Sequence, residues 1–346
     1  MLRYDERVYT AQHATAGRVG RWGPTGEPEV TPSMVRSIYQ SVVPRPVRGR
    51  LWQARRQVPR RLHELRWKVA SEAYLRRWTE DRLDPGRYCW LFILGCNNSG
   101  TTLLSEILGA HPLVRTMPKE GQWMTAAIPN STKLGVGRVF SQRLDAFRWT
   151  EAEDGACVQR LRYDWARHFR PGPGVLLEKS PPNTLRSRWL QRFFRPARFI
   201  AIVRDPYAIV EGISRRRGHS ITEAAQHWRQ VHEVLREDLP YLEHCLLIHY
   251  ESLCESPQEH LGRIERFLDL PVPFPDSLLE RQFRAHNIEG RPMALENMNP
   301  RSWARLSASD IETITRVVGD ELRHFGYQPL QTESSDERGH LRPALA

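Results

Sequence analysis

Four short, largely apolar runs, each followed by a helical pattern, constrain the fold more than any other feature of this sequence. The runs cover residues 88–95, 175–180, 198–203 and 245–250. The helices after them are expected over 101–108, from 181 through 194, from 206 and about 221, and over 256–268. Strands without polar alternation are buried on both faces, and strands that alternate with helices pair in parallel through right-handed crossovers. The sequence therefore predicts an α/β fold, a parallel β-sheet flanked by helices on both faces.

The first 87 residues are expected to form a basic N-terminal extension, made of an arm followed by a helix. Residues 1–50 show no sustained periodicity, whereas the pattern from about Arg60 to Glu80 is that of an amphipathic helix. The extension holds 18 Lys and Arg against 9 Asp and Glu, so it carries +9 of the chain's net charge of +11. Its arginines cluster at Arg45, Arg48, Arg50, Arg55, Arg56, Arg60, Arg61 and Arg66. Such a cluster can contact an anionic membrane surface, bind an acidic partner or form a solvated helical face. No nucleic-acid-binding motif accompanies it, so no nucleic-acid partner is expected.

Residues 88–330 are expected to form the α/β domain, and residues 331–346 a disordered tail. The last helix of the domain is predicted from Asp310 to Phe325. Ser309 is its expected N-cap and Gly326 its C-terminal stop, because these residue types satisfy or end the backbone hydrogen bonds of a helix.

The chain is expected to be soluble and cytoplasmic, with membrane contact limited to its basic extension. Its longest apolar run, Cys89–Cys96, is too short to span a bilayer, and charges, Gly and Pro interrupt the apolar stretches near Met1. The five cysteines form no C-x-x-C pair and suit neither a disulfide framework nor a zinc site. No metal is therefore expected.

The most informative stretch lies between the first strand and its helix, where four residues separate Gly95 from Gly100. A loop with this P-loop spacing wraps an anionic group, because successive backbone N–H groups and the helix N-terminus point into it. In proteins that hydrolyse nucleotides, the P-loop continues with a Lys that reaches the terminal phosphates, followed by Ser or Thr. Here Thr101 occupies the Lys position. The sequence predicts a phosphate-binding loop without the kinase or NTPase signature.

A second phosphate ligand is predicted at the end of the third strand, which runs directly into Arg204, Asp205 and Pro206. An Arg at the carboxyl end of a parallel strand faces the ligand crevice, and its planar fork suits a phosphate. Asp205 is expected to cap the next helix, with Pro206 in the first helical position. The alternative is an Asp that holds Mg²⁺ as in NTPases, which the absence of the loop Lys disfavours.

In their order along the chain, these motifs resemble those of the sulfotransferases that use 3′-phosphoadenosine 5′-phosphosulfate (PAPS). The stretch from Asn98 to Leu104 matches the family's 5′-phosphosulfate loop, R/K-x-G-T-T-x-L, in all but its first residue. Val203–Pro206 matches the family's 3′-phosphate element, V-R-D-P. Three further elements match in order: L-x-x-H-P-x-V at 108–114, E-K-S/T-P at 178–181 and Y-E-x-L…P…F-L within 249–271.

The resemblance implies a P-loop-like sulfotransferase domain that transfers a sulfuryl group from PAPS to a hydroxyl or amine without a metal. Residues 115–174, which interrupt the alternation of strands and helices, would be an insertion on the acceptor side. The residues that the resemblance assigns to PAPS are Asn97, Asn98, Ser99, Gly100, Thr101, Thr102, Arg204, Ser214 and Tyr250. For Tyr250, ordinary core packing is the alternative.

Two positions depart from the family pattern and bear on catalysis. Asn98 stands where the family has a Lys or Arg that stabilises the leaving phosphate. Gly212 stands where a Ser usually follows the 3′-phosphate Arg, and Ser214 lies two residues later. Asn98 can donate a hydrogen bond but brings no charge. Lys179, at the end of the neighbouring strand, is therefore predicted to supply the missing cation.

An acceptor hydroxyl also needs a general base within hydrogen-bond reach. Glu120 is the first candidate, because it follows the first helix and its His-Pro turn, where several related enzymes carry a catalytic carboxylate. The alternative for Glu120 is a solvated loop residue beside Lys119. Histidine titrates near neutral pH and suits the same task, but His111 precedes Pro112 and is expected to serve a structural turn.

The sequence thus favours a PAPS-dependent sulfotransferase. Its acceptor stays open among glycans, lipids, small molecules and tyrosyl peptides. A nucleotide-dependent P-loop phosphotransferase and a non-catalytic basic interaction protein are the alternative functions.

Overall fold

The structure, a computed structural model, describes residues 59–83, 88–169, 172–288 and 291–331. Contacts between residues divide the chain into two units, 1–70 and 71–346. Of the first unit the structure describes one helix, over residues 59–69. Most of the predicted arm, with Arg45 to Arg56, lies outside the described residues, as does the predicted tail beyond residue 331. None of the helices in the described ranges has the length and apolar content needed to cross a bilayer.

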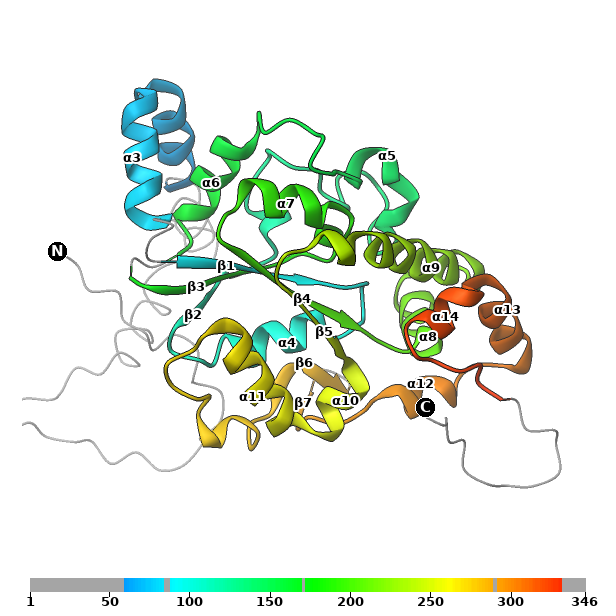
Figure 1. The fold of residues 1–346 in the computed structure, drawn as a ribbon. Helices are drawn as coiled ribbons and strands as arrows, with labels where there is room; N and C mark the ends of the chain where they lie inside the picture. The colour runs from blue at the N-terminus through cyan, green and yellow to red at the C-terminus, as the bar shows by residue number, and fades with distance from the viewer. Residues whose placement is uncertain (1–58, 84–87, 170–171, 289–290, 332–346) are drawn as a thin grey trace, which may run out of the picture. The chain divides into compact units, whose positions relative to one another are not determined.

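The second unit is built on a five-stranded parallel sheet, which confirms the predicted fold class (Figure 1). Its strands are β1 (Tyr88–Leu94), β2 (Val114–Thr116), β3 (Gly174–Lys179), β4 (Ala197–Val203) and β5 (Cys245–His249), in the order β2-β3-β1-β4-β5. The sequence predicted all of them except β2, which is too short to show a strand pattern. Because β1 is central, the loop that follows it lies in the middle of the sheet's carboxyl edge.

The other elements are mostly α-helices and short 3₁₀ helices (η). In chain order they are α3 (Glu72–Leu83), α4 (Thr101–Leu108), η1 (Gly121–Trp123), η2 (Phe140–Arg143), α5 (Leu144–Phe147), α6 (Val158–Ala166), η3 (Pro181–Arg186), α7 (Ser187–Phe193), α8 (Pro206–Arg217), α9 (Ile221–Asp238), η4 (Leu239–Tyr241), α10 (Tyr250–Glu255), α11 (Pro257–Leu268), η5 (Asp276–Leu278), β6 (Phe283–Ile288), β7 (Arg291–Met293), α12 (Asn299–Trp303), α13 (Ala308–Val318) and α14 (Asp320–His324). The helix predicted over residues 101–108 is found with those bounds.

Each face of the sheet carries its own apolar core, because successive strand residues point to opposite faces. Trp90 and Phe92 of β1 belong to one core, together with residues of α7 and α9. Leu91 and Ile93 belong to the other, together with residues of α4 and α11. Figure 1 shows these pairs of helices on opposite sides of the sheet. Burial on both faces explains why the strands are apolar at nearly every position.

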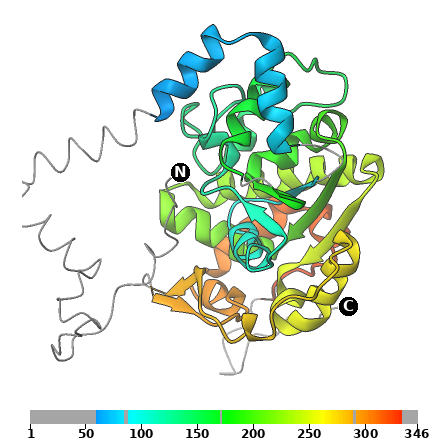
Figure 2. The ribbon, with the colours of Figure 1, turned by 90° about the vertical axis from the view of Figure 1, so that its left-hand side faces the viewer.

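An antiparallel hairpin that the sequence did not predict follows the sheet domain's last strand. Strands β6 and β7 pair with each other and form a separate two-stranded sheet. Strand β6 lies beside α4, as Figure 2 shows. Beyond the hairpin, α12 packs on α8 and returns the chain to the carboxyl edge of the large sheet.

Two of the predicted helices are each interrupted. The helix expected from Arg60 to Glu80 breaks at residues 70–71, and α3 begins afresh because the Ser71 hydroxyl accepts a hydrogen bond from the Tyr74 N–H group (3.3 Å). A Ser in this position satisfies an N–H group that the helix itself leaves unpaired.

The predicted C-terminal helix starts earlier and ends earlier than expected. Its N-cap is Ser307 rather than Ser309, because Ser307 and Asp310 form a capping box, in which each side chain binds the other residue's N–H group. Gly319, with φ 54°, ends α13, and the short helix α14 covers the rest of the predicted span.

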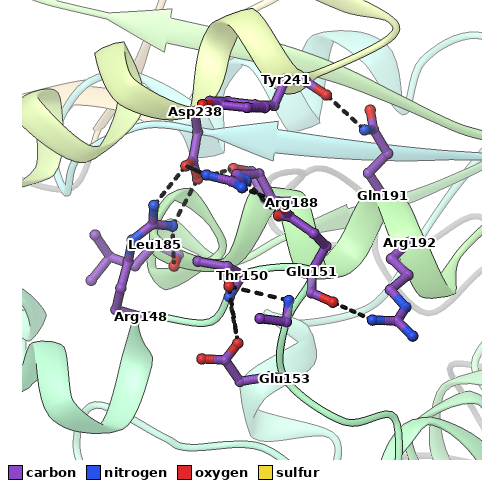
Figure 3. Close-up of polar contacts among 12 residues, drawn as sticks. Arg148, Thr150, Glu151, Glu153, Leu185, Arg188, Gln191, Arg192, Asp238 and Tyr241 are labelled. Carbon is purple, nitrogen blue, oxygen red and sulfur yellow. Dashed lines mark hydrogen bonds and ion pairs between the residues drawn. The ribbon is translucent and has the colours of Figure 1, made fainter.

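A charged cluster joins the insertion to the helices on one face of the sheet (Figure 3). Asp238, fully buried at the end of α9, accepts hydrogen bonds from Arg148 to both carboxylate oxygens (2.7 and 2.9 Å). The Ser187 hydroxyl at the start of α7 donates a third (2.6 Å). Arg188 approaches Asp238 to 3.9 Å and forms an ion pair with Glu151. The insertion is therefore fixed to the domain by matched charges.

Candidate active site

A cavity of about 670 Å³ lies where the predicted motifs meet at the carboxyl edge of the sheet. The loop after β1, the first turn of α4, the residue after β4 and the residue after β5 all contribute to its wall. The sequence-predicted site residues that line it are Asn97, Asn98, Gly100, Thr101, Thr102, Glu120, Arg204 and Tyr250. The other three, Ser99, Lys179 and Ser214, are not among its lining residues.

The loop after β1 has the geometry of an anion-binding loop. Gly100 has φ 98° and lies against the Tyr250 ring, so that a Cβ atom there would be only 2.9 Å from a ring carbon. No side chain caps the start of α4, and the N–H groups of a first helical turn have no partner within the helix. They are therefore available to an anion in the cavity. Ser99 is fully buried and donates to the Cys96 carbonyl (2.7 Å), so its side chain shapes the loop.

The surroundings of Asn98 are defined for its backbone, its side-chain oxygen and its side-chain nitrogen. Its backbone has φ 68°, a left-handed conformation that Asn tolerates, and its carbonyl accepts a hydrogen bond from Arg204 (2.8 Å). Its side-chain Oδ1 accepts a hydrogen bond from Arg138. Its Nδ2 is buried without a hydrogen-bond partner, and a Cβ atom at Gly212 would lie 2.9 Å from it. Asn98 and Gly212, the two positions that depart from the family pattern, therefore lie next to each other in the structure.

Arg204 lines the cavity and also supports its walls. Its guanidinium lies over the Tyr250 ring at 4.0 Å, and its Nε donates to Asn299 Oδ1 (2.7 Å). The Tyr250 hydroxyl in turn donates to the Glu296 carbonyl (3.1 Å). Tyr250 thus packs between Gly100 and Arg204, which places it in the cavity wall.

Asp205 caps α8, which confirms the prediction. Its carboxylate accepts from the Ala208 N–H group (2.8 Å) and from Trp303 Nε1 (2.9 Å). Burial raises the pKa of Asp205 to about 6. Both of its observed contacts belong to the fold.

Glu120 and Lys179 lie together at the loop. Lys179 Nζ is 2.8 Å from Glu120 Oε1 and 3.0 Å from Thr102 Oγ1. The other carboxylate oxygen of Glu120 accepts from Gln122 Nε2 (2.6 Å) and Trp123 Nε1 (3.3 Å). Glu120 is therefore not a solvated residue beside Lys119. The candidate base, the candidate cation and a loop hydroxyl share one hydrogen-bonded group.

A buried carboxylate fixes the backbone next to Glu120. Glu178, at the end of β3, accepts hydrogen bonds from the Gly121 N–H group (2.7 Å) and the Ser180 hydroxyl (2.5 Å). Its complete burial raises its pKa. Trp165 Nε1 donates to the Gly121 carbonyl (3.1 Å). Both polar groups of the peptide backbone after Glu120 are thus tied to buried side chains.

The cavity is strongly basic. The arginines that line it are Arg138, Arg204, Arg215, Arg216, Arg301 and Arg305, and its acidic lining residues are Glu120 and Glu211. Arg215 forms an ion pair with Glu211. Burial lowers the pKa of Arg216, and the neighbouring positive charge of Arg215 lowers it further. Such a cavity suits a ligand that carries several negative charges.

The structure gives His111 a place in the fold, as predicted. Its Nε2 is 2.9 Å from the Val272 carbonyl, and its Nδ1 accepts from the Leu113 N–H group (3.1 Å). Both ring nitrogens are therefore used away from the cavity. Ser214 is also away from it, because two residues turn a helix by about 200° and Gly212 is the residue of α8 that faces Asn98.

The sequence did not identify the cavity residues that come from the insertion and from α12. Arg138, Arg301 and Ser302 line the cavity and belong to no motif. Arginine supplies all but four of the chain's 51 basic residues, so a single Arg gave no signal.

Comparisons with known proteins point to one family. Residues 91–276, more than half of the chain, match the model of the sulfotransferase family. The protein-tyrosine sulfotransferase of Drosophila melanogaster is 30% identical over 268 residues, which cover 69% of this chain and 52% of that protein. Protein-tyrosine sulfotransferase 1 of Danio rerio is 26% identical over 268 residues, or 69% of this chain and 72% of that protein. The chain thus spans about half the length of the Drosophila relative. Among solved structures, sulfotransferase STF9 from Mycobacterium avium has 18% identity and a TM-score of 0.47, over 74% of this chain and 81% of that chain.

Proposed function

Since this chain belongs to the sulfotransferase family, we propose that it transfers a sulfuryl group from PAPS to an acceptor hydroxyl. One observation carries the proposal. Lys179 Nζ bridges Thr102 of the anion-binding loop and the carboxylate of Glu120, at 3.0 and 2.8 Å. Transfer needs a group that holds the donor and a base that takes the acceptor's proton. Here one side chain, that of Lys179, contacts both the loop that would hold the donor and the carboxylate that would be the base.

The residues of the cavity fit a donor with negative charge at both ends. Gly100 leaves room for the Tyr250 ring, and the first-turn N–H groups of α4, which no side chain caps, can hold a phosphate. Arg204 and the arginines of α8 and α12 that line the cavity would hold the 3′-phosphate. PAPS supplies a sulfuryl group activated by its link to a phosphate.

In this proposal Glu120, which pairs with Lys179 at the loop, accepts the proton of the acceptor hydroxyl as that oxygen attacks sulfur. A new S–O bond forms to the acceptor while the S–O bond to the 5′-phosphate breaks. The electron pair of the broken bond leaves with adenosine 3′,5′-bisphosphate. Lys179 and the N–H groups beside Thr102 stabilise the charge on the sulfuryl oxygens during this displacement.

For the acceptor, we propose the phenolic hydroxyl of a tyrosyl residue. Two of the relatives are named protein-tyrosine sulfotransferases. Trp123, 45% exposed, has its Nε1 3.3 Å from Glu120, so an apolar ring beside the base can pack on an aromatic acceptor. A phenol, with a pKa of about 10, also loses its proton more readily than an alcohol.

Two measurements test the proposal. Calorimetric titration should show binding of adenosine 3′,5′-bisphosphate by the purified chain and no binding of ATP with Mg²⁺. Transfer of labelled sulfate from PAPS should occur to a tyrosyl peptide and not to the same peptide with Phe in place of Tyr. Binding of ATP with Mg²⁺ alone would instead indicate a phosphotransferase, and equal labelling of both peptides would refute the tyrosyl acceptor.

A further inference from the structure

We propose that Arg138 supplies the positive charge that the loop lacks at Asn98. The cation that faces the leaving phosphate would then come from the insertion and reach the loop through space. This inference rests on the proposed function, because it concerns the charge that develops on the 5′-phosphate during sulfuryl transfer.

Two hydrogen bonds join Arg138 to the loop. Asn97 Nδ2 donates to the Arg138 carbonyl (2.5 Å), which fixes the backbone of Arg138 beside the loop. The Arg138 guanidinium donates through Nη1 to Asn98 Oδ1. Arg138 also lines the cavity together with Asn97 and Asn98. Its charge therefore lies at the loop position where the family carries its own cation.

The contact with Arg138 decides which way the Asn98 amide points. A guanidinium has only donors, so the amide atom that faces it must be the oxygen. The amide nitrogen is then turned to Gly212, where it is buried without a partner. In this orientation Asn98 acts as an acceptor that holds Arg138. The sequence suggested that the Asn98 amide donates a hydrogen bond to PAPS. In this orientation it does not.

Gly212 makes this orientation possible. A Cβ atom there would lie 2.9 Å from Asn98 Nδ2, closer than two such atoms can pack. Any larger residue would push the amide away from α8 and disturb its contact with Arg138. The family's Lys or Arg and its Ser are thus replaced by three coupled residues, Asn98, Gly212 and Arg138.

The chemistry of arginine fits the role. Its planar fork carries five N–H donors, so one side chain can hold Asn98 and a phosphate oxygen together. Lys179, which the sequence predicted for this task, contacts Glu120 and Thr102, and its role at the leaving phosphate stays a prediction. In our proposal the two cations serve different groups, Lys179 the sulfuryl oxygens and Arg138 the leaving phosphate.

The first test is Arg138→Gln, with binding measured by calorimetry. We expect the affinity for adenosine 3′,5′-bisphosphate to fall about 10- to 100-fold, as for a lost charged hydrogen bond, and turnover about 10²- to 10³-fold. The affinity for adenosine 3′-monophosphate, which lacks the 5′-phosphate, should stay within about twofold of the parent. The matched control is Arg143→Gln, which removes the same charge from an exposed pair with Asp145 and should change neither affinity. Equal losses for both ligands, or none for either, would overturn the inference.

A second test moves the charge back to the loop. Adding Asn98→Arg to Arg138→Gln should recover at least about tenfold in turnover, since it restores a donor to the transition state. A purely structural role for Arg138 predicts no recovery, and that result would count against us. The thermal unfolding midpoint of each variant shows whether it is folded.

A third variant changes the contact between Gly212 and the Asn98 amide without replacing a charged residue. Gly212→Ala should displace the Asn98 amide and reduce the affinity for adenosine 3′,5′-bisphosphate severalfold, again sparing adenosine 3′-monophosphate. The control is Gly262→Ala on α11, where a Cβ atom would meet Arg266 at an ordinary 3.6 Å. Unchanged affinity in Gly212→Ala would refute the coupling.

The parent protein separates the two proposals. A parent that neither binds adenosine 3′,5′-bisphosphate nor transfers sulfate from PAPS refutes the donor assignment and the inference with it. A parent that does both, with an Arg138→Gln variant that does so equally well, refutes the inference alone.

Discussion

Two arginine clusters of the same domain differ in what balances their charge. Around Asp238, Arg148 donates to both carboxylate oxygens and Arg188 pairs with Glu151 (Figure 3). None of these side chains is among the buried, unpartnered groups of the described residues. In the cavity, by contrast, arginines outnumber acidic residues, and the Nδ2 of Asn98 has no partner.

One arginine of each cluster has a shifted pKa, and the two shifts are in opposite directions. A hydrogen bond to Glu151 raises the pKa of Arg188. Burial and then the charge of Arg215 lower the pKa of Arg216. In the first cluster, Arg148 and Arg188 each have a carboxylate partner within the fold. In the cavity, Arg215 and Arg305 share Glu211, so we expect an anionic ligand to balance the excess of arginines there.

Removing a carboxylate from the cavity should have the largest effect, and the effect should be on turnover rather than on ligand affinity. In Glu120→Gln, turnover should fall about 10²- to 10⁴-fold because the acceptor's proton has no base. The affinity for adenosine 3′,5′-bisphosphate should not weaken, since the lost charge is negative. Steady-state rates and calorimetry on the same preparation measure the two. Near-parent turnover would exclude Glu120 as the base.

Removing a carboxylate from the other cluster should instead affect stability. Asp238→Asn leaves Arg148 and Arg188 without their buried counter-charge and should lower the free energy of unfolding by about 3 kcal/mol. Denaturant titration measures it. In the control, Asp145→Asn breaks an exposed pair and should leave stability unchanged. If Asp238→Asn reduced ligand affinity at full stability, the distinction between the clusters would be wrong.

Arg204 combines the binding and the structural role, because it lines the cavity and also holds the loop backbone through the Asn98 carbonyl. Arg204→Ala should weaken binding of adenosine 3′,5′-bisphosphate by about 1.5–3 kcal/mol, or about 10- to 150-fold. Part of the loss should persist with adenosine 5′-monophosphate, because Arg204 also holds the Asn98 carbonyl (2.8 Å). The control is Arg229→Ala, an exposed arginine of α9 that pairs with Glu233. A loss confined to ligands with a 3′-phosphate would show that the loop holds its shape without Arg204.

The smallest effect is expected at Ser214, which lies away from the cavity. Ser214→Ala should leave ligand affinity and turnover within about twofold of the parent, because Ser214 does not line the cavity. Calorimetry with adenosine 3′,5′-bisphosphate measures this. A tenfold loss of affinity would mean that Ser214 does replace the family's Ser at position 212.

Local patterns made most of the fold and the loop predictable from sequence. Apolar strands, the Gly95–Gly100 spacing and the Asp205 cap each depend on neighbours within a few residues. The break at Ser71 was missed because a single capping bond overrode a continuous periodicity.

The partners across the cavity were harder to predict. Lys179 was located by its motif, but its contact with Glu120 joins residues 59 positions apart. Arg138 had no motif at all, and its contact with Asn98 depends on how the insertion folds back over 40 residues. The sequence could show that a cation was missing at Asn98, but only the folded insertion shows which residue is near enough to replace it.

The hydrogen bond from Gly121 to Glu178 has a consequence for how such enzymes diversify. It fastens the peptide after Glu120, the proposed base, to the end of β3, so that the position of Glu120 is tied to the sheet. Residues of the insertion that hold neither this backbone, as Trp165 does, nor the loop, as Arg138 does, can then change without shifting Glu120. A change of acceptor can therefore arise within the insertion without moving the proposed base.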